Sequence, residues 1–200
     1  MINFMNKPTL TEKTGRVVLW PFQSEDISTM LDILSLPGVN NLTSSVDEFT
    51  HEKVVMPADE REKTIAWYQT RNQQNDRMDL AIVYSNVLVG EVVLNNYEAK
   101  AESCNIRILI ADSHTNLGIG SVALSLMIDA AFNRLTSKMI TLDVASFNPR
   151  ARHVYEKLGF KPTAVLANDY TISGQRYDST VMTVTPETFK PQFFKLKQSH

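Results

Sequence analysis

Hydrophobic and polar positions change their period several times along the chain, and each change marks an expected element. Several short runs are rich in β-branched and aromatic residues and are bounded by turn residues, a pattern typical of strands. These predicted strands cover residues 16–22, 79–84, 87–95, 103–110, 138–145, 160–172 and 176–184. Helices are expected over residues 24–36, 58–72, 117–135 and 148–159. No clear period runs through residues 37–57, so this stretch is predicted to be mostly loop.

Residues at the helix ends support these boundaries. Ser24 precedes two acidic residues and is the expected N-cap of the first helix. Asn148 and Pro149 predict the start of the last helix, and Gly159 predicts its end. The segment 117–135 is apolar apart from one stripe with a spacing of four, formed by Ser121, Ser125, Asp129 and Asn133. A largely buried helix is therefore expected there.

The predicted order is β, α, α, β, β, β, α, β, α, β, β, which indicates a mixed α/β fold rather than a repeat array. A chain of 200 residues with 43% hydrophobic content can bury a substantial core as one unit. We therefore expect a single domain over residues 1–200, with its core at about 16–184 and a polar tail over 185–200.

Charge and cysteine content exclude several classes of protein. The net charge is −2 and the basic residues are scattered, so no nucleic-acid partner is expected. Cys104 is the only cysteine, which excludes an internal disulfide framework and favours a buried small side chain. The first residues lack the apolar run of a signal peptide, and no stretch approaches the ~20 apolar residues that span a bilayer. A cytoplasmic protein without a membrane partner is expected.

The histidines are too scattered to predict a metal site or a Ser-His-Asp triad. They fall in predicted loops, on an exposed helix face and in the tail, at His51, His114, His153 and His200.

A glycine-containing loop joins a predicted strand to the long helix. Its sequence from Thr115 to Ser121 is TNLGIGS, and the backbone N–H groups and helix dipole at such a junction favour an anion such as phosphate. Glycine lets the backbone approach that anion closely. A plain helix entry with small residues for close packing explains the loop equally well.

A dinucleotide-binding fold is the competing interpretation of this loop. Residues 118–123 satisfy the pattern G-x-G-x-x-A, and Asp143 lies twenty positions beyond Ala123. That fingerprint normally opens a series of alternating strands and helices, whereas this chain ends in two consecutive strands. A nicotinamide-dependent dehydrogenase is thus a distant alternative, and the lack of Lys-Ser or Lys-Thr after Gly120 excludes a Walker-type loop.

A second motif points to a family. Residues 148–160 read NPRARHVYEKLGF, which resembles the signature helix of the GNAT acetyltransferases, N-x-x-A-x-x-x-Y-E-K-x-G-F. The glycine loop then resembles the family's pyrophosphate-binding segment, Q/R-x-x-G-x-G/A, about thirty residues upstream. Thr115 stands where that segment usually has glutamine or arginine. The resemblance covers residues 16–184, and its last part is similar to the RimJ/RimL-type branch.

The resemblance implies a GNAT fold, in which a mostly antiparallel sheet flanked by helices splays between its fourth and fifth strands, here 103–110 and 138–145. It implies acetyl-CoA as co-substrate and no metal. The backbones of Leu109 and Ile110 are expected to bind the pantetheine arm, with Asn148 beside it and Arg150 near a phosphate. The pyrophosphate is expected to lie on Leu117, Gly118, Ile119, Gly120 and Ser121.

The same resemblance implies direct acetyl transfer to an amine. Tyr155 is the expected general acid that protonates the leaving thiolate. Asp143 and Glu91 are the candidate bases. The acceptor is predicted to be a protein N-terminal amine or a small amine such as a polyamine, an aminoglycoside or an amino acid, and a homodimer is possible by analogy. A protein that binds acyl-CoA without turnover is the alternative.

Overall fold

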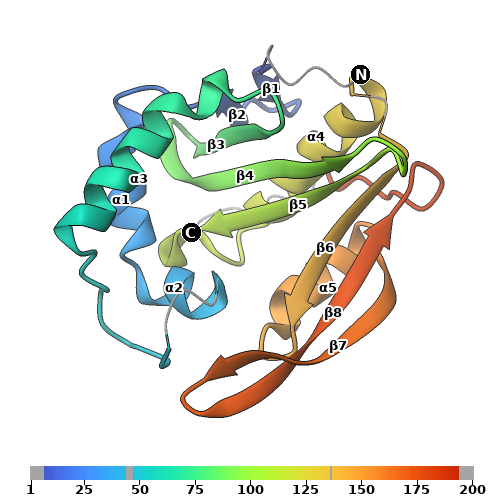
Figure 1. Ribbon diagram of the computed structural model, residues 1–200. Helices are drawn as coiled ribbons and strands as arrows, with labels where there is room; N and C mark the ends of the chain where they lie inside the picture. The colour runs from blue at the N-terminus through green and yellow to red at the C-terminus, as the bar shows by residue number, and fades with distance from the viewer. Residues whose placement is uncertain (1–6, 44–46, 136, 194–200) are drawn as a thin grey trace.

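The computed structural model describes residues 7–43, 47–135 and 137–193, and one eight-stranded sheet forms its centre (Figure 1). The strands are β1 (Leu10–Thr11), β2 (Val17–Pro21), β3 (Met78–Tyr84), β4 (Val87–Glu98), β5 (Ser103–Ile110), β6 (Met139–Ala145), β7 (Lys161–Ile172) and β8 (Gln175–Val184). The helices are α1 (Asp26–Leu34), α2 (Pro37–Thr43), α3 (Ala58–Thr70), α4 (Ile119–Asn133) and α5 (Pro149–Lys157). Short 3₁₀ turns cover Arg71–Gln73 and Asp112–His114.

The sheet is antiparallel except at one junction. Its order is β1-β2-β3-β4-β5-β6-β8-β7, and only the β5–β6 pair is parallel among the described strands. This arrangement confirms the expected mixed α/β fold with a mostly antiparallel sheet. It also removes the dinucleotide-binding alternative, which needs a mainly parallel sheet.

The two faces of the sheet carry separate clusters of buried side chains. Leu80 and Ile82 belong to the larger cluster, which contains the buried face of α4 and Tyr155 of α5. Ala81 lies between them in sequence and belongs to the other cluster, beneath α1 and α3. Because successive side chains of a strand point to opposite faces, α4 and α5 cover one face and α1 and α3 cover the other.

Helix α2 was not expected, since residues 37–57 were predicted to be mostly loop. Pro37 and Gly38 suggested a break, but proline is compatible with the first turn of a helix. The Gly38 N–H donates to Oδ2 of Asp112 at 3.0 Å, so a carboxylate 74 residues away caps this end. The Asn40 amide also donates to the carbonyl oxygens of Leu34 and Leu36. Because these hydrogen bonds involve a distant residue and side chains, the local pattern of hydrophobic and polar residues did not predict this helix.

The start of α1 also differs from the prediction. The N-cap is Glu25 rather than Ser24, and its side chain makes no capping hydrogen bond. Oδ2 of Asp26 instead accepts from the backbone N–H of Gln23 at 2.9 Å and from the indole N–H of Trp20 at 3.1 Å. The carboxylate one residue later in the chain therefore fixes the helix entry.

The described part of the predicted tail packs against the domain. The Lys190 N–H donates to the Leu158 carbonyl at 2.9 Å, and the Gln192 N–H donates to Oγ of Ser125 at 2.8 Å. The Phe189 ring lies 5.8 Å from that of Phe132. Residues 185–193 thus join α4 to the end of α5 and are not a free polar tail, whereas residues 194–200 lie outside the described residues.

Candidate active site

A cleft opens where β5 and β6 separate. The two strands are in register only from Ser103 opposite Met139 to Asn105 opposite Thr141, and beyond that rung they diverge (Figure 1). The cleft has a volume of about 580 Å³, and its walls include both strands, the start of α4, one face of α5 and helix α2. The splay predicted between residues 103–110 and 138–145 is therefore present.

The glycine loop forms one end of this cleft. Gly118 is the N-cap of α4 with φ of 87°, a conformation that favours glycine. The first intrahelical bond runs from Val122 N–H to Gly118 O, so the preceding N–H groups of the first turn have no partner within the helix. The cleft is lined there by Gly118, Ile119, Gly120 and Ser121. Such an end can hold a phosphate, as the sequence predicted.

Leu117 differs from the other residues of the loop. Its side chain packs against the larger core cluster, and it does not line the cleft. Leu109 and Ile110 do line the cleft on β5, as predicted.

Helix α5 adds polar and basic side chains to the cleft wall. Oδ1 of Asn148 accepts from the Ala151 N–H at 3.2 Å, and this cap confirms the predicted helix start. Asn148 and Arg150 both line the cleft, as do His153 and Lys157 further along the helix. Only Arg150 of these three basic residues was predicted from the sequence, although the spacing of three and four residues indicates that they share one helix face.

Tyr155 projects from α5 into the cleft near Asp143. It is 9% exposed, and its ring lies 5.7 Å from that of Phe160. Burial, and then the charge of Asp143, raise the pKa of Tyr155 to about 12. The phenol is therefore protonated at neutral pH and can donate a proton to a group bound in the cleft.

Asp143 also lines the cleft, from β6. Its Oδ2 accepts from the Tyr170 hydroxyl at 2.8 Å. Burial, and then this hydrogen bond and the charge of Asp143, raise the pKa of Tyr170. Tyr170 lines the cleft as well and was missed from the sequence, because only the pairing of β7 and β8 brings it to β6.

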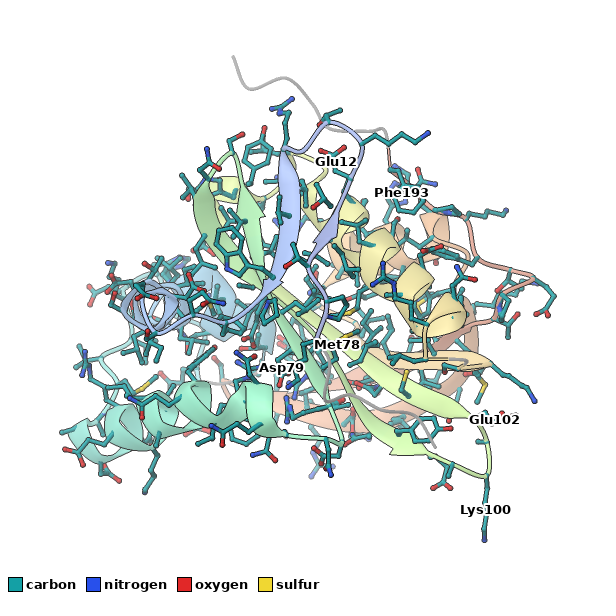
Figure 2. All side chains as sticks on the ribbon, turned by 90° about the horizontal axis from the view of Figure 1, so that it is seen from above. Glu12, Met78, Asp79, Lys100, Glu102 and Phe193 are labelled. Atoms are coloured by element: carbon teal, nitrogen blue, oxygen red, sulfur yellow. The ribbon has the colours of Figure 1, made fainter. Side chains whose placement is uncertain are left out.

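Glu91, the other candidate base, lies outside the cleft. Its Oε2 accepts from Arg71 Nη1 at 2.6 Å and from the Tyr68 hydroxyl at 2.9 Å. Arg71 also pairs with Asp79, which is fully buried, and Figure 2 shows Asp79 in the interior beside α3 while Lys100 and Glu102 stand at the tip of the β4–β5 hairpin. The structure therefore places Glu91 in a buried ion cluster beneath α3 rather than beside Tyr155.

The β7–β8 hairpin and the segment between α2 and α3 meet beyond the cleft. The Ser173 N–H donates to the Asp47 carbonyl at 2.7 Å. Phe49 and Phe147 are in edge contact, with ring centroids 5.6 Å apart, and Tyr170 and Tyr177 both pack on Phe147. These contacts join the hairpin to the segment between α2 and α3 at this end of the cleft.

The protein thus belongs to a class in which a splayed sheet, a helix start that can bind an anion and a helix that carries a tyrosine surround one cleft. Residues 16–161 match the family model described as acetyltransferase (GNAT) domain, and the chain belongs to this family.

Two proteins of similar sequence are spermidine N(1)-acetyltransferases. The protein of Vibrio cholerae serotype O1 is 32% identical over 91 residues, which cover 46% of this chain and 53% of the relative. The protein of Escherichia coli strain K12 is 32% identical over 88 residues, which cover 44% of this chain and 46% of the relative. The chain spans about half the length of the curated relatives it matches.

Solved structures share the fold. A spermidine N-acetyltransferase from Vibrio cholerae in complex with CoA and spermine has a TM-score of 0.72 at 21% identity, covering 86% of this chain and 97% of that one. A probable acetyltransferase has a TM-score of 0.74 at 17% identity, covering 89% of this chain and 97% of that one. These likenesses confirm the GNAT fold.

Proposed function

We propose that this protein is an acetyl-CoA-dependent N-acetyltransferase that moves the acetyl group directly onto a primary amine. The observation that supports the proposal is that one cleft is lined by Tyr155 and Asp143 near the splay of β5 and β6 and by the glycine loop at its other end. Membership of the GNAT family supports the same activity. When bound, acetyl-CoA supplies an activated acetyl thioester.

The residues of the cleft fit this co-substrate. The first turn of α4 receives the pyrophosphate, and the basic face of α5, including Arg150, lies where further phosphate charge is bound. The backbones of Leu109 and Ile110 receive the pantetheine arm, and the Asn148 amide, whose oxygen caps α5, keeps its N–H groups available for the arm. The backbone cradle does not need the side chain that Thr115 replaces.

Two side chains handle protons. Tyr155 donates its proton to the sulfur as the thiolate leaves, since its pKa of about 12 keeps the phenol protonated and able to act as a donor at neutral pH. Asp143 accepts the proton of the incoming ammonium, directly or through water, and the Tyr170 hydroxyl orients its carboxylate. Glu91 is not part of this proposal, since its carboxylate is bound by Arg71 and Tyr68.

The proposed activity is tested by acetyl-CoA-dependent release of free thiol. Polyamines belong in the acceptor panel because the relatives are named for spermidine, together with N-terminal peptides, aminoglycosides and amino acids. Thiol release with any acceptor, accompanied by an acetylated product in the mass spectrum, supports the enzyme. Acetyl-CoA binding without release from any acceptor favours the alternative, a catalytically silent acyl-CoA-binding protein.

We also propose a homodimer that forms through β7. This strand lies at the sheet edge, and Val165 and Leu166 are 65% and 44% exposed. An apolar edge strand favours pairing with another chain. Sedimentation velocity should show a dimer that Val165→Lys converts to monomer, whereas Val87→Lys, at a residue 51% exposed on β4, leaves the dimer intact. A monomeric parent protein contradicts the proposal.

Assignment to the RimJ/RimL-type branch and a cytoplasmic location stay predictions from the sequence. Within residues 7–43, 47–135 and 137–193, no helix has the length and apolar character needed to cross a membrane.

A further inference from the structure

Arg107 and Asp143 occupy equivalent positions on the two strands that splay. Asn105 and Thr141 form the last rung of the β5–β6 pair, and Arg107 and Asp143 each lie two residues beyond it. Both residues line the cleft. The narrow end of the cleft is therefore flanked by a basic residue on β5 and an acidic residue on β6.

Both side chains project to the same face of the sheet. Ile106 and Ile108 on either side of Arg107 pack in or against the larger core cluster, as do Leu142 and Val144 on either side of Asp143. Since side chains alternate along a strand, Arg107 and Asp143 point away from that cluster. Their face is opposite to the one covered by α4 and α5, so an acceptor approaching from it meets both charges.

The Arg107 guanidinium is available for a ligand. It is exposed, and it makes no hydrogen bond or ion pair with any residue in the part of the chain that the structure describes. Its positive charge reaches the cleft: it lowers the pKa of Tyr170, whereas burial and the contacts with Asp143 raise that pKa. Asp143, by contrast, already accepts a hydrogen bond from Tyr170.

The CoA phosphates do not account for Arg107. The first turn of α4, and Arg150 near the start of α5, provide positive groups toward the wider part of the cleft. Arg107 precedes the end of β5 by three residues, a separation of about 10 Å along the strand at ~3.3 Å per residue. It therefore lies nearer the reacting end of the cleft than the phosphate-binding end.

We propose that Arg107 binds a carboxylate of the acceptor, so that the preferred acceptor is an amine that also carries a carboxylate, such as an amino acid. This inference rests on the proposed acetyltransferase activity. The ammonium of such an acceptor lies on the Asp143 side of the opening and its carboxylate lies on the Arg107 side, where the planar guanidinium can donate two parallel hydrogen bonds. A polyamine lacks the anionic group and brings further positive charge toward Arg107.

Matched acceptors test the inference. Amino acids are compared with their carboxamides, which differ only in the carboxylate, and with spermidine. We expect the parent protein to prefer the acid in kcat/KM by roughly 10- to 100-fold, the range expected for a hydrogen bond to a charged group. Arg107→Gln should raise KM for the acid by a similar factor and abolish the preference, with kcat and the KM of acetyl-CoA little changed. Arg107→Lys should restore part of it.

Several outcomes overturn this inference while the acetyltransferase activity stands. One is equal use of acid and carboxamide, and another is preferred turnover of spermidine unaffected by Arg107→Gln. An equal fall in kcat for every acceptor assigns Arg107 to the thioester carbonyl instead. Calorimetry with N-acetyl amino acids and CoA-loaded protein tests the site without turnover. If no thiol is released with any acceptor but calorimetry shows binding of the acid that depends on Arg107, the activity has failed and the inference stands. Absence of that binding overturns the inference.

Discussion

Tyr155→Phe is expected to lower kcat for acetyl transfer by about 100-fold, the low end of what a positioned general acid contributes. The phenol has no hydrogen bond to another residue described by the structure, and burial beside Asp143 raises its pKa to about 12. Its proton is thus available to the leaving thiolate throughout the range in which the protein is assayed. Steady-state thiol release at saturating acetyl-CoA measures the effect.

The control for this variant is the protein's integrity. Phenylalanine keeps the ring that packs 5.7 Å from Phe160, and no hydrogen-bond partner is left unsatisfied. The urea midpoint and the acetyl-CoA dissociation constant should therefore stay close to those of the parent protein. The loss should also persist from pH 6 to pH 9, because the Tyr155 pKa lies well above that range. An unchanged kcat assigns the tyrosine to packing alone and shifts leaving-group protonation to water.

Elements whose signals are local could be predicted from the sequence. Helix α5 carries its cap, its first-turn proline and its terminal glycine within a dozen residues, and the structure places Asn148, Pro149 and Gly159 as expected. The strands from β3 to β8 follow runs of β-branched and aromatic residues bounded by turn residues, and the Ser85-Asn86 turn has both φ angles positive. The glycine loop could be recognised because its chemistry needs consecutive backbone groups.

Elements that depend on distant partners could not be predicted. Helix α2 depends on the Asp112 carboxylate, which reaches its first turn from beyond β5. Glu91 looked like a base on a strand, and only the arrival of Arg71 at the end of α3 shows that its charge is already neutralised. The pattern of hydrophobic and polar residues around helix α2 or around Glu91 gives no indication of those contacts.

The two charged residues at the narrow end of the cleft also could not be predicted from the local sequence. Arg107 and Asp143 are 36 positions apart in the chain, and their equivalence follows only from the register that pairs Asn105 with Thr141. Sequence motifs mark the two parts of the cleft that we propose bind CoA, the glycine loop and the start of α5, because the groups in each are close together in the chain. The acceptor end is assembled from separate strands and becomes visible only with the sheet.

Arg71→Met is expected to destabilise the protein by about 3–5 kcal/mol, the cost of breaking a buried ion pair by removing one partner. Arg71 is 2% exposed and pairs with Asp79 at 3.0 Å and with Glu91 at 2.6 Å. Its guanidinium carbon lies 4.6 Å from the centroid of the Tyr68 ring. The variant leaves the Glu91 charge without the cation that it contacts, while Asp79 keeps its ion pair with Arg77. Equilibrium urea unfolding measures the loss.

The pH dependence of unfolding identifies the cause. Burial by itself raises the pKa of Asp79, but hydrogen bonds from Arg77 and Arg71, and their charges, outweigh it and hold the pKa below its ordinary value. That stabilisation is present above the unfolded pKa of about 3.9 and is lost as pH falls through the folded pKa. Removing Arg71 brings the folded pKa of Asp79 closer to the unfolded value, so the variant loses less stability on acidification and its deficit relative to the parent protein should narrow as the pH falls below about 3.9.

Two further variants separate charge from packing. Lys63→Met removes an exposed pair with Asp59 on the same helix and should leave the midpoint nearly unchanged. Arg71→Met combined with Glu91→Met removes both members of one pair and should recover part of the loss, because an unpaired buried charge is more costly than an apolar pair. If the double variant is no more stable than the single one, Arg71 stabilises α3 through its contacts with the aromatic rings.

A third variant, Glu91→Gln, tests the role of this cluster in catalysis. A kcat equal to that of the parent protein in the folded variant shows that the cluster supports the fold and takes no part in proton transfer.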